Sequence, residues 1–274
     1  MAYDMNSHEH DGNIPDDELK KEIFGSIRDK EIENVECERL MGAPRGPEKI
    51  TFKDGSIGIF KCDIRHYWMA DNPDTAIREA LVYQIDKTVG LGLVPRTMVI
   101  DDTIGGIRYN GSIQEWIKDA RDGYQMETIT PEQKKDYERL MVFDFVIGNS
   151  DRHLENILFS VDNKVHAIDN NACLIIDKDE DILAFPDQII RFFSKKVVPD
   201  IPHIVELIET FHKNKNKIVR LIDNYIHDNT KLARLMVESR INYLFTMLKK
   251  NKPFPRKYLE WRKGLDAEIQ RILS

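Results

Sequence analysis

The chain has 274 residues, a length that suits one large domain or two lobes that share a cleft. Its composition, with 41% hydrophobic and 32% charged residues, is that of a globular protein. The net charge of -7 and the lack of a concentrated basic face argue against nucleic acid as a partner, and also against adsorption to anionic membranes.

No apolar run approaches the roughly 18 residues of a membrane span, so we expect no stable membrane insertion. The acidic N-terminus has no apolar signal-peptide segment. Three cysteines, Cys37, Cys62 and Cys173, are odd in number and widely spaced, which fits neither a zinc site nor a disulfide framework. These features predict a cytoplasmic protein with reduced thiols, and they leave its oligomeric state open.

The first half of the chain predicts a small β-rich lobe. Residues 1–14 are polar and aperiodic, as in a disordered tail. Asp54-Gly55 between two apolar runs is a hairpin signal, and Gly90 follows a helical pattern. The expected elements are a helix over 16–29, three antiparallel strands within 33–62, a helix over 75–90, and strands over 94–100 and 106–109. We therefore predict an N-lobe over residues 15–111.

The second half predicts a mainly helical C-lobe over residues 112–274. Thr130 is a plausible N-cap and Pro131 suits the first position of the following helix. The basic cluster Lys213–Lys217 is interpreted as a solvated junction between two helices. The expected elements are a helix over 131–147, a hairpin within 156–168, and helices over 203–214, 216–228, 230–250 and 255–273.

The stretch from Gly148 to Phe159 is the most informative part of the chain. Asp151 and Asn156 follow an apolar helical run, and Asp169 follows a short apolar hairpin. Phosphoryl transfer needs a group near the attacking hydroxyl and hard ligands for a metal ion on the phosphates. Asp151 suits the first role, and Asn156 and Asp169 suit the second. Each residue alone could be a turn residue, but the joint spacing favours a catalytic site.

His153 lies between these groups, and its role stays open. The side chain has the chemistry to assist proton transfer or to contact the γ-phosphate. It could equally pack against its neighbours and brace the loop, because a lone histidine is a weak signal.

The N-lobe supplies a candidate pair for the phosphates. In a kinase-like cleft, a strand lysine reaches the α- and β-phosphates, and an acid on the next helix orients it. Lys61 ends an apolar strand and Glu79 lies on the following helix, so they fit these roles. Alone, Lys61 would be read as a solvated strand end and Glu79 as a surface charge.

Two loops are weaker candidates for the nucleotide site. The segment Gly42–Pro47 has the position of a phosphate-covering loop, so Gly42 and Gly46 could bind phosphate through backbone amides, but a plain β-turn fits as well. Gly111–Trp116 has the position of a hinge between lobes. Gln114 and Trp116 could contact an adenine there, or Trp116 could simply belong to the core.

The segment Val146–Asn156 resembles the catalytic loop of the phosphatidylinositol 3-/4-kinase-like group, within the protein-kinase-like superfamily. This group uses Asp-Arg-His-x-x-Asn where typical protein kinases use His-Arg-Asp-x4-Asn. Three further segments are similar to compact bacterial members and to the secretory-pathway kinases, namely Arg78–Asp86, Gly90–Pro95 and Gly111–Gln114. The resemblance covers roughly residues 33–200 and is most specific over 146–171.

The resemblance implies an α+β, bilobal protein-kinase-like fold with a small β-rich N-lobe and a mainly helical C-lobe. It also implies ATP and Mg2+ or Mn2+ as cofactors. By this resemblance Asp151 is the catalytic Asp, Asn156 and Asp169 are metal ligands, and Lys61 binds ATP with Glu79 as its partner.

The sequence departs from the usual kinase pattern in three places. The metal motif is Asp169-Asn170-Asn171 instead of Asp-Phe-Gly, the glycine pattern of the phosphate loop is missing, and no Ala-Pro-Glu anchor follows. The missing anchor weakens the case for ordinary peptide docking. Residues 172–190 carry five acids against the single Lys178, and these acids are Asp177, Asp179, Glu180, Asp181 and Asp187. An acidic segment there disfavours a phosphoinositide substrate.

These observations predict an ATP-dependent phosphotransferase that moves the γ-phosphate to a hydroxyl, with protein Ser/Thr as the leading acceptor. The alternatives are a small-molecule or lipid kinase, a protein nucleotidyltransferase, and a nucleotide-binding pseudokinase module. A pseudokinase would usually have lost at least one of the five polar residues named for the site, which argues against it.

Overall fold

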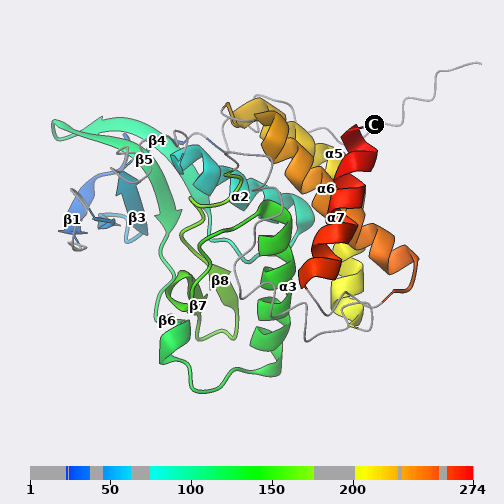
Figure 1. The fold of residues 1–274 in the computed structure, drawn as a ribbon. Helices are drawn as coiled ribbons and strands as arrows, with labels where there is room; N and C mark the ends of the chain where they lie inside the picture. Colours follow the sequence, from blue (N-terminus) through cyan, green and yellow to red (C-terminus); the bar gives the residue numbers. More distant parts are fainter. Residues whose placement is uncertain are drawn as a thin grey trace, which may run out of the picture.

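The computed structural model describes residues 23, 25–37, 46–62, 75–175, 201–227, 230–252 and 258–273. A β-rich part lies at one end of the molecule and a helical part at the other (Figure 1). The predicted α+β class is confirmed. Three sequence-based predictions fall outside the described residues: the tail 1–14, the acids of 177–187, and Gly42. Most of the helix expected over 16–29 is also outside them, but its expected end is wrong: residues 25–29 are not helical, and the Gly25 amide donates to the carbonyl of Val99 instead.

The β-rich part is a five-stranded antiparallel sheet in the order β1-β2-β3-β5-β4. Its strands are β1 (Ile32–Cys37), β2 (Glu48–Phe52), β3 (Ile57–Cys62), β4 (Thr97–Ile104) and β5 (Ile107–Glu115). The three strands expected within 33–62 are confirmed. The strand expected to end at residue 109 is too short, because β5 continues to Glu115 between β3 and β4. Residue 111, the predicted end of the N-lobe, therefore lies inside this strand.

The two faces of this sheet have different environments. Alternate side chains such as Ile50, Phe60 and Ile113 form one apolar cluster, in which Phe60 and Tyr109 meet edge to face at 5.2 Å. Alternation sends the residues between them to the opposite face. That face carries Lys61, and it also carries the cross-strand row of Lys49, Ile59, Gln114 and Thr97. The helix α2 (Thr75–Val89) contacts β4 and β5.

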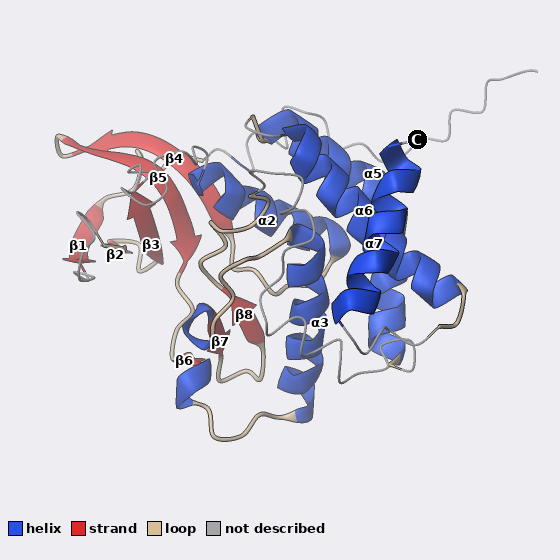
Figure 2. Ribbon diagram, in the orientation of Figure 1, coloured by secondary structure: helices blue, strands red, loops and turns tan. Residues whose placement is uncertain are grey.

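The helical part contains α3 (Pro131–Ile147), α5 (Pro202–Tyr225), α6 (Thr230–Lys249) and α7 (Tyr258–Leu273), as Figure 2 shows. The start of α3 is confirmed: Thr130 and Gln133 form a reciprocal capping box, and Pro131 follows the cap. Within the part of the chain that is described, every helix is too short or too polar to cross a bilayer.

The two helices expected over 203–214 and 216–228 are one continuous helix, α5, so the predicted junction at Lys213–Lys217 is wrong. This segment contains no glycine or proline, and its lysines and asparagines remain at least partly exposed. A polar stretch on the solvent side of a helix does not break it. Apolar residues before and after the stretch, including Phe211 and Ile218, enter the same core.

A small three-stranded sheet joins the two parts. It consists of β6 (Arg121–Asp122), β7 (Ile157–Phe159) and β8 (Val165–Ala167), so the hairpin expected within 156–168 is confirmed. The backbone amide of Ala167 donates to the carbonyl of Leu93 at 2.8 Å. Because Leu93 lies in the loop between α2 and β4, the hairpin is attached to the β-rich part.

Candidate active site

The loop after α3 begins at Gly148, which adopts a left-handed backbone with φ 67°. The Gly148 amide donates to the carbonyl of Asp144 and so closes the end of the helix. A Cβ at this position would lie 2.6 Å from the sulfur of Met236 in α6. Glycine is therefore required both by the backbone conformation and by the close approach of α6.

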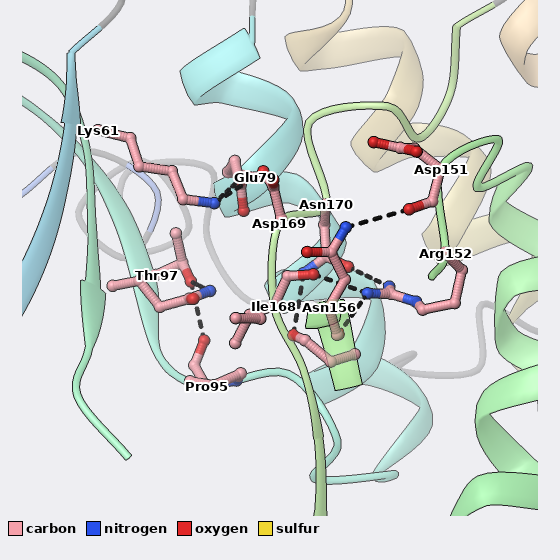
Figure 3. A network of polar contacts seen from close by, with 12 residues as sticks. Lys61, Glu79, Pro95, Thr97, Asp151, Arg152, Asn156, Ile168, Asp169 and Asn170 are labelled. Atoms are coloured by element: carbon pink, nitrogen blue, oxygen red, sulfur yellow. Dashed lines mark hydrogen bonds and ion pairs between the residues drawn. The ribbon is translucent and has the colours of Figure 1, made fainter. Parts of the chain in front are cut away.

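Asp151 is exposed, and its backbone rather than its carboxylate fixes its position. The Asp151 amide donates to Asn149 Oδ1 at 2.8 Å, and its carbonyl accepts from the His153 amide at 3.0 Å and from Asn156 Nδ2 at 3.1 Å. Figure 3 shows the carboxylate directed away from these contacts. The side chain is thus held in place while its oxygens remain accessible to a substrate.

Arg152 is fully buried and connects the loop to its surroundings. Its guanidinium pairs with both oxygens of Asp144, at 2.9 and 3.2 Å. It also donates to the carbonyls of Asn156 and Ile168, at 2.9 and 2.6 Å, and to Asn170 Oδ1 at 2.5 Å. One side chain therefore joins α3, the loop of Asp151 and the segment that ends in Asp169.

The charges in this network balance each other. Burial raises the pKa of Asp144, although the Arg152 guanidinium opposes that effect. Cys173 lies nearby with a buried free thiol, and burial raises its pKa well above the usual value. A buried ion pair with all its hydrogen bonds formed fixes geometry, and a buried thiol of raised pKa is inert.

The second part of the site is a cluster of three charges from three separate elements. Lys61 Nζ in β3 lies 2.7 Å from Glu79 Oε1 in α2 and 2.9 Å from Asp169 Oδ1, which follows β8 (Figure 3). Asp169 has φ 53°, an uncommon conformation for a residue with a side chain. Residues 108 positions apart in the sequence thus meet in one ion-pair cluster.

These three groups shift one another's pKa values. Burial would lower the pKa of Lys61, but the charges of Glu79 and Asp169 outweigh burial and raise it. The charge of Lys61 lowers the pKa of Asp169. Glu79 is buried, and burial raises its pKa despite the charge of Lys61. The lysine therefore stays protonated and Asp169 stays ionised near neutral pH.

The remaining sequence candidates lie in the five-stranded sheet or next to it. Gln114 is buried, and its Nε2 donates to Thr97 Oγ1 at 2.8 Å. Trp116 follows the end of β5, is 38% exposed, and has Lys49 Nζ 5.1 Å from its ring centroid. Its exposure contradicts the interpretation of Trp116 as a core residue. Gly46 is described as buried just before β2, whereas the rest of its predicted phosphate loop up to Arg45 is outside the described residues.

The polar residues of the site could hold a divalent metal ion only if a bound ligand supplied further oxygen atoms. Among the described residues, no group of three or more His, Cys, Asp or Glu side chains could hold an ion. Asn156 offers an amide oxygen and Asp169 a partly exposed carboxylate, which are the hard donors that Mg2+ or Mn2+ prefers. Magnesium sites of this kind use one or two protein ligands and complete the shell with phosphate oxygens and water. The residues present fit that type of site.

Four supporting residues were missed by sequence reasoning: Asp144, Asn149, Arg152 and Asn170, which are all buried and hydrogen-bonded to one another or to the loop. One signal was available, because Asp144 is a single acid inside the apolar run Met141–Ile147. A charge at a core position requires a buried partner. The identity of that partner, Arg152, comes only from the fold.

Comparisons with known proteins agree with this geometry. A sequence model of the phosphatidylinositol 3- and 4-kinase family matches residues 105–241, half of the chain. The chain therefore belongs to this family of kinase-like phosphotransferases. A search of curated proteins found no match.

Two solved structures share the fold. The proinflammatory kinase CtkA of Helicobacter pylori aligns with a TM-score of 0.50 and 13% identity, over 91% of this chain and 99% of the kinase chain. The Golgi casein kinase with Mn and ADP bound also aligns with a TM-score of 0.50 and 13% identity, over 85% of this chain and 75% of that chain. The predicted kinase-like fold is confirmed.

Proposed function

We propose that this protein is an ATP-dependent phosphotransferase, and that it moves the γ-phosphate to a hydroxyl placed beside Asp151. Protein Ser or Thr is the leading acceptor. The observation that carries the proposal is the contact between Lys61 and Asp169, at 2.9 Å. This contact brings Lys61, the candidate phosphate-binding residue of the sheet, to Asp169, the candidate metal ligand. Arg152 supports the segment around Asp169 through its hydrogen bonds to Ile168 and Asn170.

The nucleotide would bind between the sheet face of Lys61 and this loop. Lys61 would neutralise the α- and β-phosphates, and Glu79 would hold its ammonium group in place. Asn156 and Asp169 would hold a divalent metal ion, which supplies positive charge to the phosphates when it is bound. The Golgi casein kinase of similar fold was solved with Mn and ADP, which supports this choice of cofactors. Gln114 and Trp116 would line the base end of the site.

Asp151 would receive a hydrogen bond from the acceptor hydroxyl and orient it toward the phosphate. Its exposed carboxylate and fixed backbone suit that task, because a catalytic group must be accessible and well positioned.

The acceptor class is argued from charge. The acids of residues 177–187 follow the proposed metal loop in the sequence, against the single Lys178. An anionic headgroup would be repelled by such a segment, whereas a polypeptide hydroxyl would not. A small-molecule hydroxyl remains the second candidate, and we propose the cytoplasm as the site of action.

The test is incubation with ATP labelled at either the γ- or the α-phosphate, followed by analysis of labelled protein. We expect γ-label to be transferred, and Asp151→Ala to reduce transfer by about 10²- to 10⁴-fold while ADP binding stays within a few fold. Transfer of α-label would identify a nucleotidyltransferase. Binding without any transfer would identify a pseudokinase, and either result would overturn the proposal.

A further inference from the structure

The side chains of His153 and Asn156 make a contact that defines the protonation pattern of the histidine. Asn156 Nδ2 lies 3.0 Å from His153 Nε2 and 3.1 Å from the Asp151 carbonyl. An amide nitrogen only donates hydrogen bonds. His153 Nε2 must therefore be the acceptor, and a neutral ring then carries its proton on Nδ1.

The orientation of the Asn156 amide follows from the same two contacts. If the amide were rotated by half a turn, its oxygen would face the Asp151 carbonyl, and that hydrogen bond would be lost whichever ring nitrogen of His153 carried the proton. Asn156 is 5% exposed, and no described residue donates to its Oδ1. The oxygen end of the amide is therefore the end left for a ligand.

We propose that His153 is a positioning residue, which fixes the Asn156 amide through Nε2 with Oδ1 available to the metal ion, so that this ring nitrogen is not free to transfer a proton or to donate to the γ-phosphate. The inference rests on the proposed function, because it assigns Asn156 as a metal ligand. The proposal assigns the role of His153 that the sequence left open, because Nε2 of the ring already accepts a hydrogen bond from Asn156. Loss of a partner of this kind typically lowers metal affinity by about 10- to 100-fold.

Glu155 has a minor place in this arrangement. Its Oε2 lies 3.6 Å from His153 Nδ1, on the side that carries the proton in the inferred tautomer. The Glu155 side chain is 67% exposed, so this contact is weak. The orienting contact is therefore the one between Nε2 and the amide.

The experiment compares an acceptor and a donor at the same position. His153→Gln keeps an acceptor oxygen, His153→Ala has no polar group, and His153→Lys has only donors. The measurement is the Mn2+ concentration needed for half-maximal ADP binding, followed by calorimetry, and the same metal dependence of phosphate transfer. We expect Ala and Lys to raise the required Mn2+ concentration by about 10- to 100-fold, and Gln to raise it by less than about threefold.

The opposite pattern would contradict the inference: a Lys variant that keeps its metal affinity and transfer rate while Gln loses transfer would identify His153 as a donor to the reaction. Equal Mn2+ dependence in all variants would also overturn it. Failure of the wild-type protein to bind ADP with Mn2+ would instead remove the proposed function. Glu155→Gln serves as the matched control, with less than about a twofold expected change.

A spectroscopic measurement keeps the inference testable even if the variants fold poorly. Nitrogen-15 NMR distinguishes the two neutral tautomers of a histidine, and it needs only the wild-type protein. We expect the His153 proton on Nδ1 in the metal-free protein. A proton on Nε2 would contradict the proposed contact directly.

Discussion

The two halves of the candidate site are held in different ways. In the loop half, Arg152 is completely buried, and it donates to backbone carbonyls as well as to Asp144 and Asn170. In the sheet half, the described residues that hold Lys61 are its two charged partners, Glu79 and Asp169. The first half is a fixed frame built from hydrogen bonds. The second half is a balance of one positive and two negative charges, which a bound phosphate group would change.

The largest effect on stability is expected from the frame. Arg152→Met would leave Asp144 buried without its counter-charge, so we expect the free energy of unfolding to fall by about 3–5 kcal/mol. Urea unfolding measures this loss. Arg139→Met is the matched control, because the pair of Arg139 and Asp136 is partly exposed and should change stability by no more than about 0.5 kcal/mol. Similar losses in both variants would show that the frame is not special.

A smaller effect on stability, but a larger effect on binding, is expected from the charge balance. Lys61→Met removes the counter-charge of buried Glu79, and we expect a loss of about 1–3 kcal/mol, limited because Glu79 can take up a proton. ADP binding should weaken at least tenfold by calorimetry. Lys53→Met is the control, because Lys53 pairs with Glu31 and both side chains are mostly exposed. Unchanged ADP binding in Lys61→Met would remove Lys61 from the site.

The third effect concerns Asp86 near the end of α2, and it is spread over a range of pH. Burial raises the pKa of Asp86 from 3.8 to about 7, although backbone amides including those of Leu93 and Gly92 oppose the shift. The folded state therefore binds this proton more tightly than the unfolded state. Between these two values, the free energy of unfolding falls as pH rises, by at most about 1.4 kcal/mol per pH unit.

Asp86→Asn removes this contribution. From pH 4 to pH 7, we expect the free energy of unfolding of the wild type to fall relative to that of the variant. The relative fall should not exceed about 1.4 kcal/mol per pH unit. Urea unfolding at several pH values measures it, and other titrating groups cancel in the difference. Parallel pH profiles for the two proteins would contradict the raised pKa.

The sequence predicted those parts of the fold that depend on local signals. Thr130 and Pro131 mark the start of α3 and Gly148 marks its end, so its bounds were predicted correctly. The extent of β5 depends on pairing with β3 and β4 on both sides, which no local pattern reveals. The continuity of α5 was missed because a polar stretch was taken as a break rather than as a solvent-facing surface.

The candidate site shows the same division. Spacing alone indicated Asp151, Asn156 and Asp169, and the structure places the last of these against Lys61 and Glu79. The network of Arg152 could not be predicted, because it joins side chains to carbonyls that only the fold brings together. The phosphate-covering role of Gly42 and Gly46 stays a prediction.

The helix α2 is attached to the site at both of its ends. Near its start Glu79 holds Lys61, and near its end Asp86 accepts the amides of Gly92 and Leu93, while the Leu93 carbonyl accepts the amide of Ala167, two residues before Asp169. A displacement of α2 would therefore have to break contacts in both places at once. A nucleotide bound as proposed would meet side chains that are already in place, so little of its binding free energy would go into ordering the protein.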